Sequence, residues 1–135
     1  MSFPLLYFRD IKGKGRGVFS AYEIDEEVLI ERCPIILITS AAEINLIVCT
    51  SLLNYAFRWD KEENTVAIAL GFGSLYNHSC NNNAYYKMNS QKKNIEIITL
   101  RKIHAGKEVT INYVAFGSNN AEKWFKDRGI QYVKQ

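Results

Sequence analysis

The 135-residue sequence predicts a mostly β fold with short helices. Three observations support this class: short apolar or alternating segments recur along the chain, turn-forming residues separate them, and strands do not alternate with helices. The length is that of one domain with a single modest core, and no linker or internal repeat divides the chain. We therefore expect one domain over residues 1–135.

The N-terminal part is predicted to form a strand, a glycine-rich loop and a second strand. Leu5–Phe8 is the first strand, and Ile11–Gly17 is a loop in which three glycines alternate with other residues. Val18 and Phe19 resume an apolar strand. A glycine loop before a strand allows close backbone approach to a ligand, but a phosphate loop would need a helix directly after the glycines.

The remaining strands are recognised by apolar runs or by alternation of polar and apolar residues. Turns are predicted between them at Glu23–Glu27, Asp60–Asn64 and Lys102–Lys107. Pro34 separates the first two strands, because proline lacks the backbone N–H that a strand ladder uses. The predicted strands are Val28–Ile30, Ile35–Ile38, Asn54–Trp59, Thr65–Leu70, Tyr85–Met88, Ile95–Leu100 and Val109–Val114.

Two short helices are predicted from their terminal residues. Ser40 and Glu43 have the spacing of a capping box, so a helix is expected over Ala41–Cys49. Asparagines before Ala121–Arg128 and Gly129 after it predict a second helix in the tail.

The segment Gly71–Asn83 concentrates glycine and polar residues, and we interpret it as an internally bonded loop rather than a strand. His78 and Cys80 within it are candidate metal ligands. The other cysteines, Cys33 and Cys49, lie far away in the sequence, whereas structural zinc sites usually have paired ligands at short spacing. We therefore expect no metal, reduced intracellular thiols, and Cys80 as a small buried apolar side chain.

Charge is uneven along the chain, although the net charge is only +3. Residues 1–86 carry 7 basic and 10 acidic side chains, whereas residues 87–135 carry 10 basic and 4 acidic ones. The acidic half would attract a basic peptide, and the basic half could contact nucleic acid or an acidic protein. No apolar run has membrane-spanning length, and Met1–Phe8 lacks the basic leader of a secretory signal.

Three segments together resemble the SET-domain protein-lysine methyltransferases. Lys14–Phe19 is similar to the cofactor loop of that family, and Asn77–Cys80 with Asn83 is similar to its central motif. Gly106–Tyr113 is similar to its C-terminal motif. The order and spacing also match, and the resemblance is greatest to the miniature stand-alone SET domains of viruses and bacteria.

The resemblance implies a fold of small twisted β-sheets with a C-terminal pseudoknot, a core at about 5–114 and a lid at about 115–130. It also implies transfer of a methyl group from S-adenosylmethionine to a lysine of a histone tail or a similar basic protein. By resemblance, Tyr113 is the catalytic residue. The cofactor would be bound by Lys14, Gly15, Arg16, Asn77, His78 and Trp124, and the substrate channel would be formed by Tyr55, Tyr86, Ile111, Phe72 and Gly73.

Most of these residues also have a purely structural interpretation. Tyr113 fits a half-buried strand tyrosine, and Asn77 and His78 could serve only to bond the local backbone. Tyr55 and Tyr86 could be core aromatics, and Trp124 could anchor the tail helix.

The chain departs from the family pattern in three places. Asn82 stands where proline is usual, which affects the rigidity of the loop. No cysteine follows Tyr113, so the zinc-binding cap of many relatives is absent, and Lys123 precedes the tryptophan where small relatives carry a channel tyrosine. The number of methyl groups transferred cannot be read from these residues.

Two other functions remain as alternatives. One is a catalytically silent SET-like module that binds a lysine-bearing peptide, and the other is a β-rich nucleic-acid binder with strongly salt-dependent affinity. We expect a protein substrate, no direct nucleic-acid or membrane contact, and a homodimer as an open option. The expected location is intracellular: cytoplasmic in a bacterium, nuclear in a eukaryotic cell.

Overall fold

The computed structural model describes residues 5–59 and 65–113 of the chain. The helical elements in these ranges are the α-helix α1 (Ala41–Val48) and the 3-10 helices η1 (Ser51–Tyr55) and η2 (Gly73–Leu75). The strands are β1 (Leu6–Ile11), β2 (Gly15–Ser20), β3 (Leu29–Ile38), β4 (Ala56–Arg58), β5 (Val66–Ala69), β6 (Asn77–His78), β7 (Ala84–Asn89), β8 (Asn94–Thr99) and β9 (Glu108–Ile111). The mostly β expectation is confirmed.

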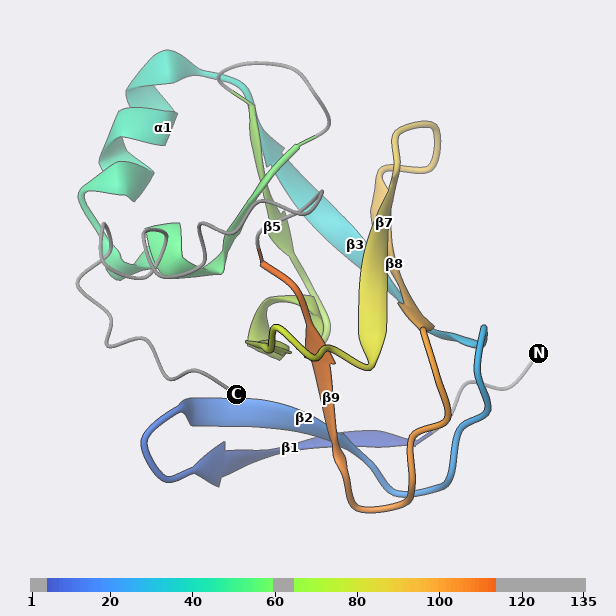
Figure 1. The fold of residues 1–135 in the computed structure, drawn as a ribbon. Coiled ribbons are helices and arrows are strands. Elements are labelled where there is room, and N and C mark those ends of the chain that lie inside the picture. The colour runs from blue at the N-terminus through green and yellow to red at the C-terminus, as the bar shows by residue number, and fades with distance from the viewer. Residues whose placement is uncertain (1–4, 60–64, 114–135) are drawn as a thin grey trace.

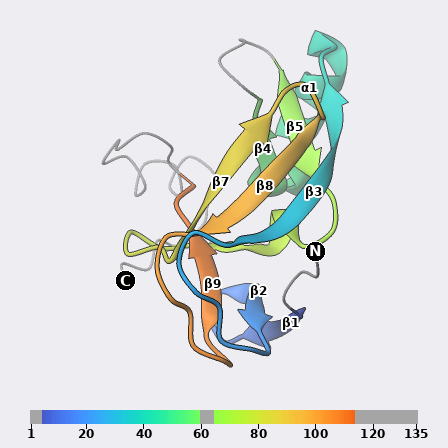
Figure 2. The same cartoon turned by 90° about the vertical axis from the view of Figure 1, so that its right-hand side faces the viewer.

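The strands form two sheets that meet near the end of the C-terminal strand β9 (Figure 1). One sheet has the order β1-β2-β9-β6 and the other the order β4-β5-β3-β8-β7. Pairing is antiparallel throughout, except that β6 and β9 run parallel. Figure 2 shows β9 extending from the lower sheet towards β7 and β8. The last described strand is therefore inserted between segments from distant parts of the chain.

The hydrophobic core consists mainly of β-branched side chains contributed by both sheets. Such side chains pack well on a pleated surface, which is why the sequence forms strands at these positions. Among the described residues, the largest completely buried side chain is that of Tyr76, which is 1% exposed and lies between η2 and β6. The other completely buried core residues include Ile30, Ile95, Ile97, Ile103, Ile111, Val18 and Val109.

The two strands predicted around Pro34 are in fact one strand, β3. Its first part, up to Pro34, pairs with β8, and its second part, from Ile35, pairs with β5. Pro34 therefore stands at the changeover between two partners, where its missing N–H interrupts neither ladder. Its carbonyl still accepts a hydrogen bond from Leu70 N at 2.8 Å.

Two other boundaries also differ from the sequence prediction. Asn54 and Tyr55 belong to η1 rather than to a strand, because Thr50 Oγ1 accepts a hydrogen bond from Leu52 N at 3.2 Å and caps this short helix. The segment Ile11–Gly17 was expected to be a loop, but most of it belongs to the strands of the β1–β2 hairpin. Ile11 pairs with Gly15, so the turn is confined to the three residues between them.

The helix α1 confirms the prediction from the capping residues. Ser40 is the N-cap, and its Oγ accepts a hydrogen bond from Glu43 N at 3.4 Å. Figure 1 shows α1 at one side of the five-stranded sheet, away from the hairpin β1–β2. No helix in the described part of the chain is long and apolar enough to cross a membrane. The predicted turn Asp60–Asn64 and tail helix Ala121–Arg128 lie outside the described residues.

Candidate active site

The central and C-terminal motifs lie side by side in the structure. Asn77 and His78 form the two-residue strand β6, whose register partners on β9 are Thr110 and Ile111. Ser79 N extends the pairing by donating to Ile111 O at 3.0 Å. This stretch was expected to be a loop, but a local reading of the sequence cannot detect a ladder formed with a strand about thirty residues away.

Asn83 fastens the same two segments through its carboxamide group. Its Nδ2 donates to Glu108 O at 2.8 Å, and its Oδ1 accepts from Thr110 N at 2.9 Å. Its own backbone N–H donates to Thr110 Oγ1 at 3.3 Å. The side chain thus bonds to β9 in the way that a neighbouring strand would, and it fixes the register of β9 against the central motif.

Tyr113 follows β9 and is held by both its backbone and its hydroxyl group. Its N–H donates to Nδ1 of His78 at 3.0 Å, and its hydroxyl donates to the carbonyl oxygen of Tyr76 at 2.6 Å. The alternating pattern predicted that Tyr113 lies in a strand. This is wrong, because β9 ends at Ile111. Burial, and then the negative charge of Glu108, raises the pKa of Tyr113. The phenol is therefore neutral at ordinary pH and acts as a hydrogen-bond donor.

His78 is 8% exposed and links Tyr113 to the central motif. Because Nδ1 accepts the backbone N–H of Tyr113, the proton of the neutral ring is on Nε2. Burial lowers the pKa of His78, which favours this neutral form. Its Nε2 lies 3.7 Å from Sγ of Cys80. Cys80 itself is exposed, which corrects its expected burial: it follows β6 in an open turn.

Asn77 connects the central motif with the hairpin β1–β2. Its Nδ2 donates to Oε2 of Glu108 at 2.8 Å and to Arg16 O at 3.1 Å. The other oxygen of Glu108, Oε1, lies 3.6 Å from Nζ of Lys14. A Cβ atom at Gly17 would lie 2.5 Å from Oε2 of Glu108, so a side chain there would displace this carboxylate. Two of the predicted cofactor-binding residues, Lys14 and Asn77, thus contact one carboxylate, and Arg16 is joined to them through Asn77.

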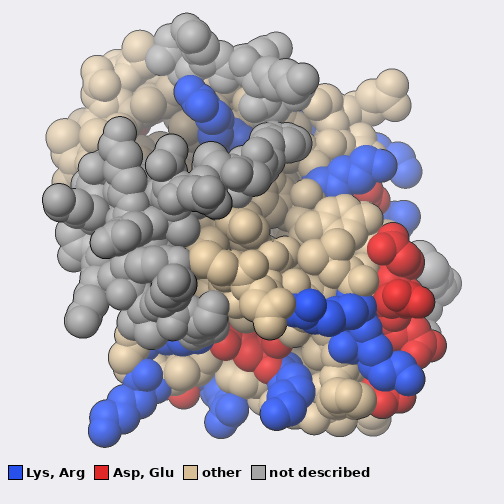
Figure 3. Space-filling view, viewed as in Figure 1, with Lys and Arg blue, Asp and Glu red and all other residues tan. Residues whose placement is uncertain are grey.

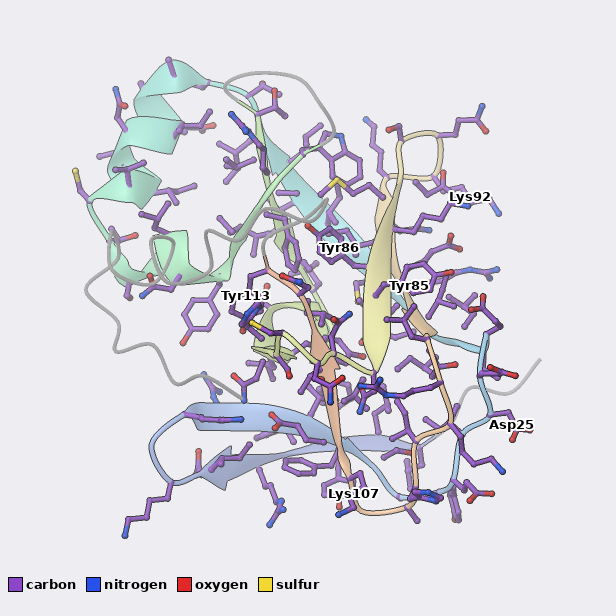
Figure 4. All side chains as sticks on the ribbon, viewed as in Figure 1. Asp25, Tyr85, Tyr86, Lys92, Lys107 and Tyr113 are labelled. Carbon is purple, nitrogen blue, oxygen red and sulfur yellow. The ribbon has the colours of Figure 1, made fainter. Side chains whose placement is uncertain are left out.

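The predicted channel residues differ in their surroundings. Tyr86 lies on the side of β7 that faces β5, with Tyr85 on the other side (Figure 4). The rings of Tyr86 and Phe57 are in edge-to-face contact with centroids 5.3 Å apart, and burial raises the pKa of Tyr86. Tyr55 is more open, at 39% exposed, and Ile111 is completely buried.

The segment Gly71–Tyr76 borders Tyr113 and is held from β3. Phe72 N donates to Oε2 of Glu31 at 2.9 Å, and the hydroxyl of Tyr76 donates to Oε1 of Glu31 at 2.7 Å. Sequence reasoning missed Glu31. The signal in the sequence is weak: Glu31 is the one carboxylate of β3, but the charged residue Arg32 stands directly beside it.

Arg101 holds the loop between β6 and β7, where the usual proline is replaced by Asn82. Its Nη2 donates to Asn81 O at 2.6 Å and to Asn82 O at 3.1 Å. Nδ2 of Asn82 donates to Ala84 O at 2.8 Å. These hydrogen bonds connect the loop to Arg101 and to its own backbone at the place where the usual proline is missing.

Trp124 and Lys123 lie outside the described residues. Residues 5–59 and 65–113 contain no group of three or more His, Cys, Asp or Glu side chains arranged to hold a metal ion.

Comparison with known proteins identifies the family. A family model described as "SET domain" matches residues 15–114. A Schizosaccharomyces pombe protein named "Histone-lysine N-methyltransferase, H3 lysine-37 specific" is 32% identical over 122 residues, which cover 90% of this chain and 78% of that protein.

Two solved structures are similar to this fold. A solved structure of a Plasmodium falciparum protein aligns with a TM-score of 0.66 and 26% identity, over 87% of this chain and 98% of that one. CpSET8 of Cryptosporidium aligns with a TM-score of 0.67 and 23% identity, over 87% of this chain and 60% of that one, and it supports the fold alone. The chain belongs to the SET-domain family and is a protein-lysine methyltransferase that uses S-adenosylmethionine as its methyl donor.

Proposed function

We propose that this methyltransferase modifies a lysine of a histone tail, with histone H3 as the first candidate, and that Tyr113 is its catalytic residue. The observation that carries the site assignment is the junction of Tyr113 with His78 and Tyr76, which brings the central and C-terminal motifs together. The choice of histone H3 is supported by the name of the S. pombe relative.

The cofactor is assigned to the hairpin turn and the central motif. Gly15 has a φ of +82°, and a Cβ atom placed on it would meet nothing within 4 Å, so the backbone beside Asn77 borders open space. This geometry fits a ligand held by backbone groups of Lys14, Gly15 and Arg16, with Asn77 and His78 at its other side. Trp124, from the tail, would cover it. When bound, S-adenosylmethionine supplies a methyl group on a positively charged sulfur, which leaves as a neutral thioether once the lysine nitrogen has taken the methyl.

The substrate lysine must reach the site as a neutral amine, because only the neutral amine has a free electron pair. A free lysine is protonated near neutral pH, and a channel lined by Tyr55, Tyr86 and Ile111 would favour the uncharged form by desolvation. The hydroxyl of Tyr113 then acts by position. It is neutral, it is directed at the Tyr76 carbonyl, and oriented dipoles of this kind can stabilise charge that changes during transfer.

The peptide on either side of the lysine is assigned to Phe72 and Gly73. The ring of Phe72 lies 6.1 Å from that of Phe8, so an apolar surface continues from the active site towards β1. Figure 3 shows basic side chains along the lower edge of the molecule and acidic side chains grouped at the right-hand edge. The acidic group would favour a basic tail through long-range attraction.

The organisation and setting of the enzyme are further parts of this proposal. We assign residues 1–135 to one domain, with a lid at about 115–130, outside the described residues, that would cover the cofactor. The enzyme would act on protein without direct contact to nucleic acid or membrane, in the nucleus of a eukaryotic cell or in the cytoplasm of a bacterium. For the oligomeric state, a homodimer is the alternative to a monomer.

The first experiment is to incubate the protein with methyl-labelled S-adenosylmethionine and each core histone, and to map the label by mass spectrometry. We expect label on lysine, and most of it on histone H3. Label confined to another histone, or to other proteins of a cell extract, would contradict the choice of H3. A silent peptide-binding module would bind a histone peptide in calorimetry and show neither turnover nor affinity for the cofactor.

A further inference from the structure

Glu31 connects β3 to the segment beside the catalytic tyrosine. Both carboxylate oxygens are used: Oε2 accepts the backbone N–H of Phe72 at 2.9 Å, and Oε1 accepts the hydroxyl of Tyr76 at 2.7 Å. These contacts hold residues 72 and 76 at the two ends of the turn that contains η2. A carboxylate in this position is therefore a two-point clamp on the turn.

The surrounding chain is shaped to admit this carboxylate. Gly71 has a φ of +64°, and a Cβ atom there would lie 2.5 Å from Oε2 of Glu31. Two residues further along each segment, a Cβ atom at Gly73 would lie 2.9 Å from Sγ of Cys33 and 2.5 Å from Cβ of Ala69. Both glycines thus permit the turn to lie directly against β3, because neither position has room for a side chain.

A register shift in β3 accompanies the clamp. Leu29 pairs with Ile98 and Glu31 with Ile97, so Ile30 is an extra residue opposite β8. Bulges of this kind redirect side chains. Here Ile30 is buried in the core while its neighbour Glu31 reaches the 71–76 turn.

A single hydrogen bond connects the clamped residue Tyr76 to Tyr113. The side chain of Tyr76 is bound by Glu31, and the carbonyl of the same residue accepts the hydroxyl of Tyr113 at 2.6 Å. Tyr76 is 1% exposed, so its ring is enclosed on all sides and transmits the constraint to its own backbone. The path from Glu31 to Tyr113 runs through this carbonyl, which has no proton, so the path conveys position and does not carry protons.

The geometry points to Glu31 as a positioning residue for methyl transfer: by clamping Phe72 and Tyr76, it sets the carbonyl that orients the hydroxyl of Tyr113. The same clamp places Phe72 and Gly73 for the peptide. The inference rests on the proposed role of Tyr113, but the clamp itself can be tested without any substrate.

The substrate-free test is the ¹³Cζ resonance of Tyr113, which responds to hydrogen bonding of its hydroxyl. The chain has eight tyrosines, and the spectrum of Tyr113→Phe assigns this one. We expect Glu31→Ala to shift the resonance although residue 31 does not touch Tyr113. Tyr76→Phe, which keeps the bond to Phe72, should shift it in the same direction. Glu96→Ala is the matched control, because the carboxylate of Glu96 bonds Arg32 on β3 and not the 71–76 turn.

Kinetics and a conservative variant separate positioning from charge. We expect Glu31→Ala to lower kcat about tenfold while KM for S-adenosylmethionine changes less than about twofold. Glu31→Gln should recover most of the loss, because its oxygen can accept from Phe72 N and its amide can donate to the Tyr76 hydroxyl. The double variant Glu31→Ala with Tyr76→Phe should be no slower than the slower single variant.

Several outcomes would overturn the inference. These are an unshifted Tyr113 resonance in Tyr76→Phe, a Glu31→Gln variant as slow as Glu31→Ala, or fully additive losses in the double variant. If Glu31→Ala does not fold, Tyr76→Phe and Glu31→Gln decide the matter by the same resonance. A wild-type protein without turnover on histones would contradict the proposed substrate and leave the resonance test of the clamp intact.

Discussion

The backbone N–H of Tyr113 donates to Nδ1 of His78 across 3.0 Å. The two rings also lie in tilted contact, with centroids 5.3 Å apart. This pair joins the end of β9 to the central motif, thirty-five residues away in the sequence. It requires His78 to be neutral, because a proton on Nδ1 would face the N–H of Tyr113.

Stability should therefore depend on pH through His78. Burial lowers its pKa in the folded protein below the ordinary value of 6.5. Between the lowered pKa and 6.5 the unfolded chain binds more protons than the folded one, so the free energy of unfolding falls as the pH falls. The contribution of the neutral His78 to stability is fully present above pH 6.5, and it is completely lost below the pKa of His78 in the folded protein. Urea unfolding measured from about pH 7 to about pH 5 tests this.

The matched comparison uses the two histidines of the chain. His78→Asn removes the titrating group and should flatten this part of the pH dependence. His104→Asn should leave this part of the pH dependence unchanged, since His104 is exposed and pairs with Glu23 at the surface. Equal pH profiles for wild type and His78→Asn would show that His78 is not the titrating group.

Asn83 should be worth more than an ordinary surface asparagine. Asn83→Asp replaces the donor to Glu108 O with an oxygen that repels that carbonyl, and we expect a loss of about 2 kcal/mol in unfolding free energy. Asn89→Asp is the control, because Oδ1 of Asn89 accepts from Lys92 N and an aspartate can still do so. Urea denaturation of both variants gives the comparison, and similar losses would contradict the role of Asn83.

Gly71 and Gly106 provide a direct test of the crowding around Glu31. Both have positive φ, +64° and +80°, but a Cβ atom meets Oε2 of Glu31 only at Gly71. Gly106→Ala should cost about 1 kcal/mol from backbone strain, and Gly71→Ala should cost more and also lower the methylation rate. Thermal unfolding and turnover of the two variants measure this difference. Equal effects would mean that the clamp tolerates a side chain at residue 71.

Asn77 should control cofactor affinity. Asn77→Asp places a second carboxylate beside Oε2 of Glu108, 2.8 Å from the present amide nitrogen, so repulsion should open the junction with Arg16. We expect the affinity for S-adenosylmethionine in calorimetry to fall about tenfold or more. Asn45→Asp, on the exposed side of α1, makes the same change in charge far from the junction and should bind normally. Normal cofactor binding by Asn77→Asp would remove Asn77 from the binding site.

The sequence predicted those elements that depend on interactions between residues close to one another along the chain. The cap at Ser40 and the apolar runs of β5 and β8 could be read directly, because each depends on residues close in sequence. Long-range pairing decided the rest. Pro34 is tolerated because β3 changes partners there, and β6 exists only because β9 lies beside it.

The candidate site shows the same division. Tyr113, Asn77 and His78 were predicted from motifs, and the structure brings them together. Glu31 and Glu108 organise that site, yet neither stands out in the sequence as a ligand of distant backbone and side-chain groups. Their roles depend on how β3 and β9 lie against segments that are thirty or more residues away.

The catalytic role of Tyr113 is measured by the methylation rate of Tyr113→Phe with labelled S-adenosylmethionine and the histone that the wild type modifies. Tyr85→Phe is the control, because Tyr85 lies on the other side of β7 from Tyr86 (Figure 4). We expect Tyr113→Phe to fold, to bind cofactor, and to lose about 100-fold or more in kcat, while Tyr85→Phe retains its rate. A Tyr113→Phe variant that transfers methyl groups as fast as Tyr85→Phe would contradict the catalytic role of Tyr113.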